Sequence, residues 1–295
     1  MTIGIPRSLF YYYDGEIWIN FFKNLGIDVI VSPNTNKEII DLGNSIANDE
    51  MCMSVKNYLG HIAYLKDKCD YIIVPRIDNY GDMNQTCTNF LAMYDIVNNL
   101  FDIPILNYNI DINNKKTLKY GLTSIGLELS KTKKEIEKAY TYSIIKYNKS
   151  QKKKIIDNYN KLKSNRKKVL VVSHSYNTYD EFIGKPIIKL LNDMDVEIIY
   201  SDLFNKSQAE ELSKNISENL YWKFSKDIIG SIEMVKDKVD GILFLSTFPC
   251  GLDSLVNELV IRKIDIPYLN IIIDDLDSLS GIETRIESFI DILNQ

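Results

Sequence analysis

The sequence predicts an α/β protein of two similar domains, each built around a parallel sheet. Short apolar runs typical of buried strands alternate along the chain with segments whose apolar residues recur at helical spacing. This alternation occurs once in each half of the chain. In addition, the segment DIPILN at 102–107 is echoed by DIPYLN at 265–270, at the same place in the element order of each half.

The first half of the chain, residues 1–129, is the expected N-terminal domain. Its expected strands are Ile3–Ile5, Asp28–Val31, Tyr71–Val74 and Ile103–Leu106. The apolar periodicity of Ile17–Leu25 predicts a helix that ends at Gly26, because glycine is a common helix stop. Strands that alternate with helices at this spacing are typical of a parallel sheet covered on both faces.

The second half, residues 168–295, repeats this plan as the expected C-terminal domain. Its expected strands are Val169–Val172, Val196–Ile199, Gly241–Leu245 and Ile266–Leu269, and Ile187–Leu191 is expected to be helical. Residues 130–167 between the domains are rich in Lys, Tyr and Asn and carry apolar residues at helical spacing. We interpret this segment as a helical linker with a solvated positive face rather than as a basic contact surface.

Composition places the chain among globular proteins and disfavours several functional classes. Of its 295 residues, 45% are hydrophobic and 25% are charged, which provides enough apolar material for a sizeable core. The net charge of −5 argues against a general nucleic-acid binder, since binding phosphates requires a concentrated basic face. The sequence has neither an apolar run of about 20 residues nor a basic and then apolar leader. We therefore expect a cytoplasmic protein that is neither secreted nor bound to a membrane.

Three of the four cysteines stand directly before a helical pattern, and these are Cys52, Cys87 and Cys250. At least two of them also follow a strand, at the sheet edge where open α/β folds bind ligands. At a helix N-terminus the unpaired backbone N–H groups and the helix dipole stabilise a thiolate, which is the form that binds metal. Cys69 stands just before a strand instead, and we expect it to be structural.

This cysteine pattern leaves three interpretations open. The three residues are small buried hydrophobic side chains, or they converge on a zinc ion with His61 or His174 as the fourth ligand. In the third interpretation they hold an iron–sulfur cubane and leave one iron open to water or substrate. Four cysteines are too few for a disulfide scaffold, and the absence of a C-x-x-C pair disfavours a ferredoxin-type run and a zinc ribbon.

Motifs spread over nearly the whole chain match one known family. They are Gly4–Arg7, Tyr11–Tyr13, Asp49–Cys52, Val55–His61, Val74–Arg76, Cys87 with Phe90–Leu91, His174–Asn177, Tyr179–Asp180, Tyr221–Trp222, Phe248–Gly251, Asp253–Leu255, Gly281, Thr284–Arg285 and Glu287. Through these motifs the chain resembles the 2-hydroxyacyl-CoA dehydratase family, and in particular its activase-associated members.

The resemblance implies two Rossmann-like domains with an iron–sulfur cluster in the cleft between them. It maps the three cluster cysteines of the family onto Cys52, Cys87 and Cys250, which would hold a [4Fe-4S] cluster or a double cubane. In true dehydratases an ATP-driven activator delivers one electron, and a CoA thioester then loses its 2-hydroxyl group. Related double-cubane proteins reduce small molecules instead. A homodimer is an open alternative to a monomer.

The segment after the strand at Val169–Val172 carries the candidate catalytic residues His174, Tyr176 and Asn177. They could donate hydrogen bonds or protons to a ligand in the cleft, or they could satisfy the backbone of their own loop. Neither a Gly-x-Ser-x-Gly elbow nor a P-loop is present, so ATP chemistry would come from a partner.

Together these observations predict an iron–sulfur protein for low-potential one-electron chemistry on a ligand at the open iron. Such a protein would be a reductase or dehydratase component, or an electron-transfer protein, that depends on the ATP-driven activator. The alternatives are a zinc-binding protein and a two-domain small-molecule binding protein, both without redox activity.

Overall fold

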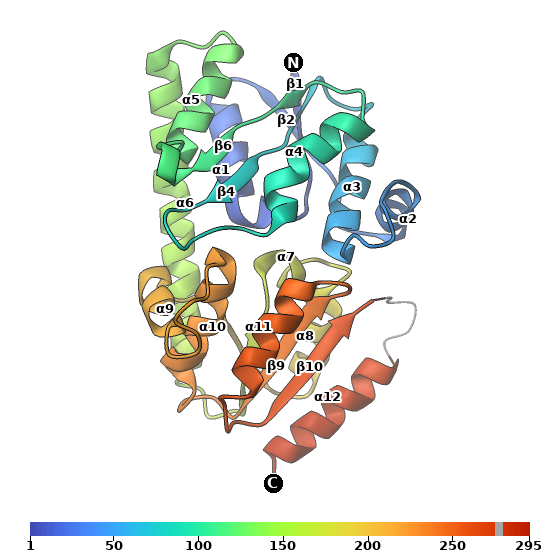
Figure 1. Cartoon of the computed structure of the whole chain (residues 1–295), viewed down its shortest axis with the longest axis vertical. Helices are drawn as coiled ribbons and strands as arrows, with labels where there is room; N and C mark the ends of the chain where they lie inside the picture. Colours follow the sequence, from blue (N-terminus) through green and yellow to red (C-terminus); the bar gives the residue numbers. More distant parts are fainter. Residues whose placement is uncertain (275–279) are drawn as a thin grey trace. The chain divides into compact units, whose positions relative to one another are not determined.

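The computed structural model describes residues 1–274 and 280–295 and divides into two compact units. Unit 1 spans Met1–Ser150 and unit 2 spans Gln151–Gln295. Each unit has a four-stranded parallel sheet with helices packed on its faces (Figure 1). The expected α/β class, with two Rossmann-like domains and parallel sheets, is therefore confirmed.

The unit 1 sheet has the strand order β2-β1-β3-β5. Its strands are β1 (Thr2–Ile5), β2 (Asp28–Val31), β3 (Tyr71–Ile73) and β5 (Ile105–Leu106). All three pairings are parallel, and Ile3 of the central strand lies opposite Val29 on one side and Tyr71 on the other. A separate parallel pair, β4 (Arg76–Asn79) with β6 (Asn109–Asp111), follows β3 and β5 along the chain.

The unit 1 helices connect these strands and bury their apolar faces. They are α1 (Tyr11–Asn24), α2 (Lys37–Ile46), α3 (Met53–Leu65), α4 (Thr88–Leu100) and α5 (Leu118–Glu128), with a 3-10 turn η1 (Ile112–Asn114) before α5. The predicted helix at Ile17–Leu25 is the second part of α1, whose Trp18, Phe21 and Phe22 are fully buried.

The unit 2 sheet has the strand order β10-β9-β7-β8, again with every pairing parallel. Its strands are β7 (Lys168–Val172), β8 (Glu197–Tyr200), β9 (Gly241–Thr247) and β10 (Tyr268–Ile273). Its helices are α7 (Ser175–Thr178), α8 (Gly184–Asp193), α9 (Lys206–Ser213), α10 (Lys223–Val235), α11 (Gly251–Ile261) and α12 (Ser280–Leu293). The core on one face includes Phe204, Ile232 and Phe244, all buried.

The two sheets share one topology. In each, the first strand lies between the second and the third, and the fourth extends the sheet beside the third. The echoed segments at 102–107 and 265–270 supply the fourth strands, β5 and β10, so the echo marks equivalent positions. Both fourth strands begin directly after a proline, Pro104 or Pro267, because proline has no N–H to donate to the ladder.

The segment expected as a linker contains one long helix, α6 (Lys133–Lys161). Its first turns bury Ile136 and Ala139 in unit 1, whereas Ile145 is 64% exposed. Near its end, Asn158 accepts a hydrogen bond from the Tyr200 N–H at 2.9 Å in unit 2. Neither α6 nor another helix of the described residues combines the length and the apolar character that crossing a bilayer demands.

Helices α2 and α3 pack at backbone contact through two glycines. A Cβ placed at Gly60 would lie 2.0 Å from the carbonyl oxygen of Ile39, and a Cβ at Gly43 would lie 2.1 Å from that of Lys56. Unit 2 has an equivalent glycine contact between helices, because a Cβ at Gly230 of α10 would lie 1.7 Å from the carbonyl oxygen of Ala209 in α9. These contacts fix the helices that lead into β3 and β9.

We predict that Gly60→Ala destabilises the protein by at least about 2 kcal/mol, because the added methyl group forces the two helix backbones apart. Gly281→Ala is the matched control, since a Cβ there has no heavy atom within 4 Å. The control is expected to be neutral or to stabilise by up to about 1 kcal/mol. Urea unfolding measures both variants, and equal stability of the two would contradict the prediction.

Candidate functional site

Cys52 and Cys87 lie at the carboxyl edge of the unit 1 sheet, meaning the edge where its parallel strands end. Helices α3 and α4 each lead into a strand of this sheet, β3 and β5, and therefore begin at that edge. Cys52 is the N-cap residue of α3, and Cys87 is the N-cap residue of α4. The expectation that these cysteines begin helices is therefore confirmed.

Both residues are unusual N-caps. Their backbones have the extended N-cap conformation, with φ −64° and ψ 150° at Cys52 and φ −60° and ψ 144° at Cys87, yet neither side chain makes a capping hydrogen bond. Oxygen-bearing residues are the preferred caps, and Asn36, Thr117 and Asn205 each accept a backbone N–H in this way. Phe10, Ile183 and Trp222 also begin helices without a side-chain cap. Capping therefore does not account for cysteine at the starts of α3 and α4.

The aromatic ring of Phe10 connects the two cysteine-capped helices. It lies 5.5 Å from the ring of Tyr58 in α3 and 4.8 Å from that of Phe90 in α4, edge-on to both. All three rings are buried. Edge-to-face aromatic pairs of this kind are favourable beyond the area they bury. The loop after β1 therefore holds the first turns of α3 and α4 in one arrangement.

The strand β4 positions the residue before Cys87. The Thr86 hydroxyl donates to the carbonyl oxygen of Ile77, and the Thr86 N–H donates to that of Asp78 at 3.0 Å. Next to this contact, the Asn79 side chain donates to Asp111 of β6 at 2.8 Å. Hydrogen bonds from Asn114 and Asn79 lower the pKa of the Asp111 carboxyl. The two-stranded sheet, which the sequence did not predict, thus anchors the start of α4.

His61, a candidate zinc ligand from the sequence, has both ring nitrogens engaged inside unit 1. Its Nδ1 lies 2.8 Å from the Ser32 hydroxyl, and its Nε2 lies 3.1 Å from the Thr35 hydroxyl. The ring is fully buried, and burial together with the charge of Arg7 lowers its pKa to about 3. A neutral histidine bonded on both sides serves the fold, which disfavours its role as a fourth metal ligand.

Cys69 differs from the other cysteines in its surroundings as well as its position. Its thiol donates to the carbonyl oxygen of Leu65 at 3.3 Å and packs on Gly4, where a Cβ would lie 2.5 Å from its sulfur atom. Burial raises its pKa to about 11, so it remains a protonated thiol at neutral pH. These contacts agree with the structural role expected for it.

Cys250 occupies the corresponding edge of the unit 2 sheet. It follows β9 and is the N-cap residue of α11, the helix that leads into β10. Its sulfur atom accepts the Asp253 N–H at 3.4 Å, and its own N–H donates to the carbonyl oxygen of Thr247 at 2.9 Å. The expected placement of Cys250 between a strand end and a helix start is confirmed.

The predicted catalytic segment follows β7 at the same edge of unit 2. His174 caps α7, and its Nε2 lies 2.9 Å from Oδ1 of Asp253, with both side chains buried. The half-buried ring of Tyr176 stacks on His174 at 5.0 Å and 12°, and Asn177 is fully buried. The sequence argument gave Asp253 no role, although this residue lies in a motif of the family resemblance and in the first turn of the helix that Cys250 begins.

A second carboxylate fixes the one-turn helix α7. Asp202, just after β8, accepts hydrogen bonds from Ser175 at 2.7 Å and from Tyr179 at 2.9 Å. At the other side, the Ser173 hydroxyl donates to the carbonyl oxygen of Leu245 in β9 at 2.6 Å. The segment around His174 is therefore tied to the strands on both sides of β7.

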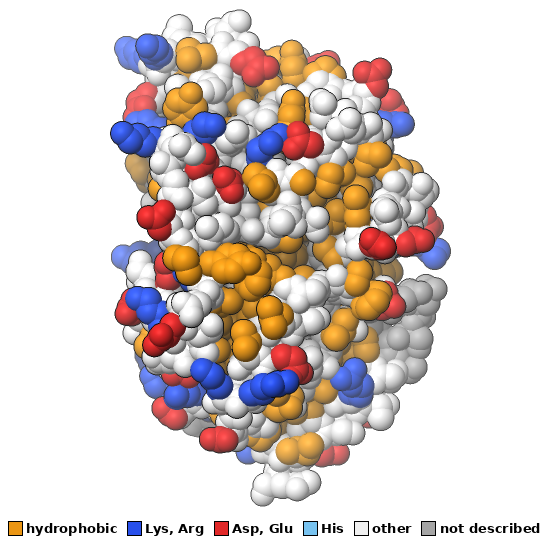
Figure 2. Space-filling model, in the orientation of Figure 1, with side chains coloured by type: hydrophobic (Ala, Val, Ile, Leu, Met, Phe, Trp, Pro, Cys, Tyr) orange, Lys and Arg blue, Asp and Glu red, His pale blue; other side chains and the backbone are white. Residues whose placement is uncertain are grey.

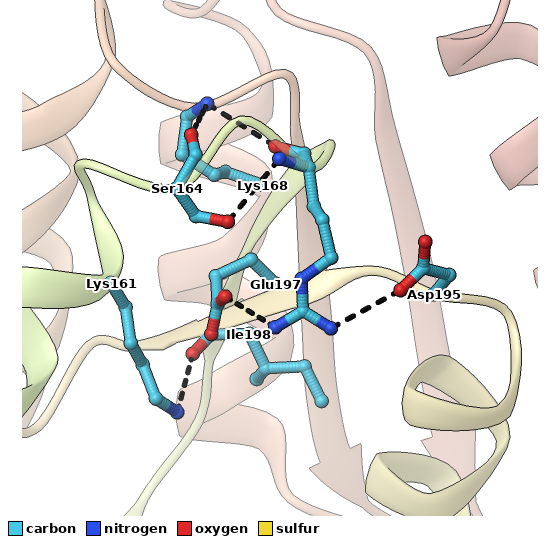
Figure 3. A network of polar contacts seen from close by, with 7 residues as sticks. Lys161, Ser164, Lys168, Asp195, Glu197 and Ile198 are labelled. Carbon is cyan, nitrogen blue, oxygen red and sulfur yellow. Dashed lines mark hydrogen bonds and ion pairs between the residues drawn. The ribbon is translucent and has the colours of Figure 1, made fainter.

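The charged cluster of unit 2 lies at the opposite, amino edge of its sheet (Figure 3). Arg166, just before β7, pairs with Glu197 at the start of β8 and with Asp195 at 3.3 Å. Lys161, the last residue of α6, donates to the carbonyl oxygen of Ile198 at 3.1 Å. Lys161 thus ties the end of α6 to β8, and Arg166 ties the segment before β7 to the start of β8. These contacts agree with a structural rather than a ligand-binding role for this part of the expected linker.

Apolar side chains gather on the surface over α10 and α11 (Figure 2). Exposed apolar residues of this region include Tyr221 at 42%, Phe248 at 52% and Leu255 at 51%. Phe248 lies two residues before Cys250, and Leu255 lies on the helix that Cys250 begins. Exposed apolar side chains therefore stand on both sides of Cys250 along the chain.

The structure thus places two cysteines at one edge of unit 1 and the third at the corresponding edge of unit 2. Within residues 1–274 and 280–295, no three His, Cys, Asp or Glu side chains gather closely enough to hold a metal ion. The proposed cluster ligands Cys52, Cys87 and Cys250 remain a prediction, as do the catalytic roles of His174, Tyr176 and Asn177.

A family model described as "CoA enzyme activase uncharacterised domain" matches residues 2–204 of the chain. This range covers unit 1 except Met1, and it reaches past β7 and β8 of unit 2. No curated protein matches the chain.

Several solved structures share a distant likeness of fold. The SBP FpvC of P. aeruginosa in complex with Ni²⁺ is 14% identical over 100% of this chain and 96% of that chain, with a TM-score of 0.32. An aspartate racemase homologue from Pyrococcus horikoshii OT3 is 15% identical over 100% of this chain and 99% of that chain, with a TM-score of 0.21. At these scores the likeness carries no argument about the site.

We predict that His61 stays neutral at about pH 5 and that the fold weakens as the pH falls toward this value. The folded pKa of about 3 lies below the ordinary value of 6.5, so the unfolded chain binds more protons between these two values. Stability is therefore complete above about pH 6.5 and falls by about 2 kcal/mol by pH 5. Nitrogen-15 NMR of the two histidines reports the charge of His61, and an imidazolium signal at pH 5 would contradict the prediction.

The stability measurement needs a background without Asp14, because this carboxyl titrates in the opposite sense. Burial raises its pKa to about 6, although a hydrogen bond from Tyr108 lowers it, so the folded state holds its proton more tightly than the unfolded state. Asp14 thus adds stability as the pH falls through this value. Urea unfolding of Asp14→Asn at about pH 8 and about pH 5 measures the loss due to His61 without the opposing contribution of Asp14.

Proposed function

Because the chain belongs to the family described as CoA enzyme activase uncharacterised domain, we propose that it is an iron–sulfur protein of the 2-hydroxyacyl-CoA dehydratase type. In this proposal Cys52, Cys87 and Cys250 hold a [4Fe-4S]-type cluster. The protein then carries out low-potential one-electron chemistry as a reductase or dehydratase component.

One observation carries the proposal, namely which residues cap the equivalent helices of the two units. Four helices, α3, α4, α10 and α11, lead into the third and fourth strands of the two sheets. Their N-cap residues are Cys52, Cys87, Trp222 and Cys250. Three of these four positions hold cysteine, at sites where an oxygen-bearing residue would cap better. Cys250 accepts a capping bond, whereas Cys52 and Cys87 make none, so thiol chemistry accounts for the cysteines of α3 and α4 better than helix stability does.

The donor set suits an iron–sulfur cluster. All three sulfur atoms belong to half-exposed thiols, and thiolates are the usual ligands of such clusters. The N-termini of α3, α4 and α11 place backbone N–H groups and the positive end of a helix dipole beside each sulfur, which stabilises the thiolate. The proposal requires that the three sulfur atoms bind one cluster.

When bound, a cluster of this type supplies one-electron transfer at low potential, with the iron that lacks a cysteine ligand open to a small molecule. The residues of the chain provide the setting for that chemistry. The buried ring of Phe10 packs on Tyr58 and Phe90 and so holds α3 and α4 against each other. The exposed apolar side chains Phe248 and Leu255 near Cys250 suit a ligand or partner with apolar surface.

The electron source in this proposal is a partner protein. The sequence contains no P-loop, and the family description refers to an enzyme activase. We therefore assign ATP hydrolysis to an activator that delivers one electron to this chain. The substrate would be a CoA thioester or a small reducible molecule, and a double cubane would be the alternative to a single cluster.

We predict that anaerobic purification yields a brown protein with about four irons per cluster unit and a matching amount of sulfide. Cys250→Ser is expected to lose most of this iron, because serine still caps α11 but provides no thiolate. Iron and sulfide analysis with visible absorption spectra measures both proteins.

Cys69→Ser is the matched control, since Cys69 is the cysteine that donates to Leu65 inside unit 1. It is expected to keep its iron and colour. A colourless protein with a single zinc ion would favour the zinc-binding alternative, and a protein that stays free of metal after anaerobic cluster reconstitution would favour a small-molecule binder. Either result would overturn the iron–sulfur proposal.

A further inference from the structure

Unit 2 contains a buried histidine with one ring nitrogen held by a carboxylate and the other left open. Nε2 of His174 lies 2.9 Å from Oδ1 of Asp253, and the two residues are 4% and 6% exposed. Nδ1 of the same ring is buried and has no hydrogen-bond partner among residues 1–274 and 280–295. Leaving a buried acceptor or donor without a partner is costly, so an open nitrogen at this place calls for an explanation.

The position of the pair favours a ligand as that explanation. His174 follows β7 and Asp253 follows β9, and these are the neighbouring strands from which the chain winds outward in opposite directions to β8 and β10. In open parallel sheets ligands bind outside the carboxyl ends of the strands at such a switch point. The open Nδ1 therefore lies at the place where this fold ordinarily binds a small molecule.

Asp253 determines which hydrogen bond Nδ1 can make. A carboxylate only accepts hydrogen bonds, so the contact at Nε2 requires that this nitrogen carry the proton. Asp253 lies in the first turn of α11, where the helix dipole favours a negative charge. In the neutral ring the second nitrogen then has a lone pair and no proton. Nδ1 is thus an acceptor, and its natural partner is a hydroxyl or N–H group.

We propose that His174 accepts a hydrogen bond at Nδ1 from a hydroxyl- or N–H-bearing small molecule, and that Asp253 is the positioning residue that fixes the ring for this role. The inference goes beyond the iron–sulfur proposal, because it concerns contacts within unit 2 and holds whether or not a cluster is bound. It also assigns a role to Asp253. Because Nδ1 is buried, the ligand reaches it only when the residues around it move.

The tautomer of His174 provides the first test. Nitrogen-15 NMR on the full chain at about pH 8 resolves the two histidines, and the wild-type ring should carry its proton on Nε2. Asp253→Asn should shift at least about half of the population to the Nδ1-protonated form, since an amide no longer imposes the proton on Nε2. A wild-type ring protonated on Nδ1, or an unchanged tautomer in Asp253→Asn, would overturn the role of Asp253.

Asp202→Asn is the matched control for this measurement. It removes the other carboxylate that holds the α7 segment, through Ser175 and Tyr179, but it does not touch the imidazole. The tautomer should be unchanged in this variant and also in Cys250→Ser, which lacks a proposed cluster ligand. A change in Asp202→Asn as large as in Asp253→Asn would show that any disturbance of the segment moves the proton, and would contradict the proposal.

A pair of small probes tests the ligand itself. Phenol carries an O–H donor, whereas anisole has a methyl group in place of that proton and is otherwise similar. Phenol at millimolar concentration should shift the Nδ1 resonance of His174 and leave His61 unchanged, because both nitrogens of His61 already have partners. Anisole should shift neither histidine. No shift with phenol, or equal shifts with the two probes, would overturn the assignment of an acceptor site.

Discussion

The parallel pairing of all strands in each sheet is the constraint on which the rest of the structure depends. Parallel neighbours cannot be joined by a tight turn, so the chain must cross back over the sheet before each new strand. A helix that leads from one strand of a sheet into the next strand of the same sheet therefore starts at the carboxyl edge. The strand topology alone therefore puts the N-cap residue of such a helix at the carboxyl edge of the sheet. The cysteines at 52, 87 and 250 acquire their position in this way.

The two units use the same plan in more detail than their strand order. Gly60 follows the N-cap Cys52 by eight residues, and Gly230 follows the N-cap Trp222 by the same interval. Each glycine allows its helix to touch the backbone of the preceding helix, Ile39 in one unit and Ala209 in the other. Trp222 therefore occupies in unit 2 the position that Cys52 holds in unit 1. The two units therefore have the same geometry at this position but carry side chains of different chemistry.

Much of the architecture could be predicted because local patterns carry it. Apolar runs predicted the strands of both sheets. The starts of the helical patterns predicted that three cysteines begin helices. The pair β4 and β6 escaped prediction because Arg76–Asn79 and Asn109–Asp111 are polar and lack the apolar signal of a strand. Predicted ends also failed where proline intervened, since the strand expected from Ile103 begins only after Pro104.

The candidate site was harder to predict for a different reason. The contact between His174 and Asp253 joins residues 79 positions apart, and no local pattern reports a pairing of that kind. The sequence offered both His61 and His174 as candidates for a metal ligand. Their surroundings separate them, because His61 is bonded at both nitrogens and His174 at one. Long-range packing, rather than residue type, makes this distinction.

The cysteine N-caps also have a cost that bears on how this protein could change over time. A sulfur atom that makes no capping bond leaves α3 and α4 short of a stabilising contact that serine or asparagine would supply, on the order of 1 kcal/mol for each helix. Mutational drift without a need for thiols would favour such replacements. Homologues with an oxygen-bearing residue at the N-caps of α3 and α4 would then be more stable proteins that have kept the fold and lost the original function.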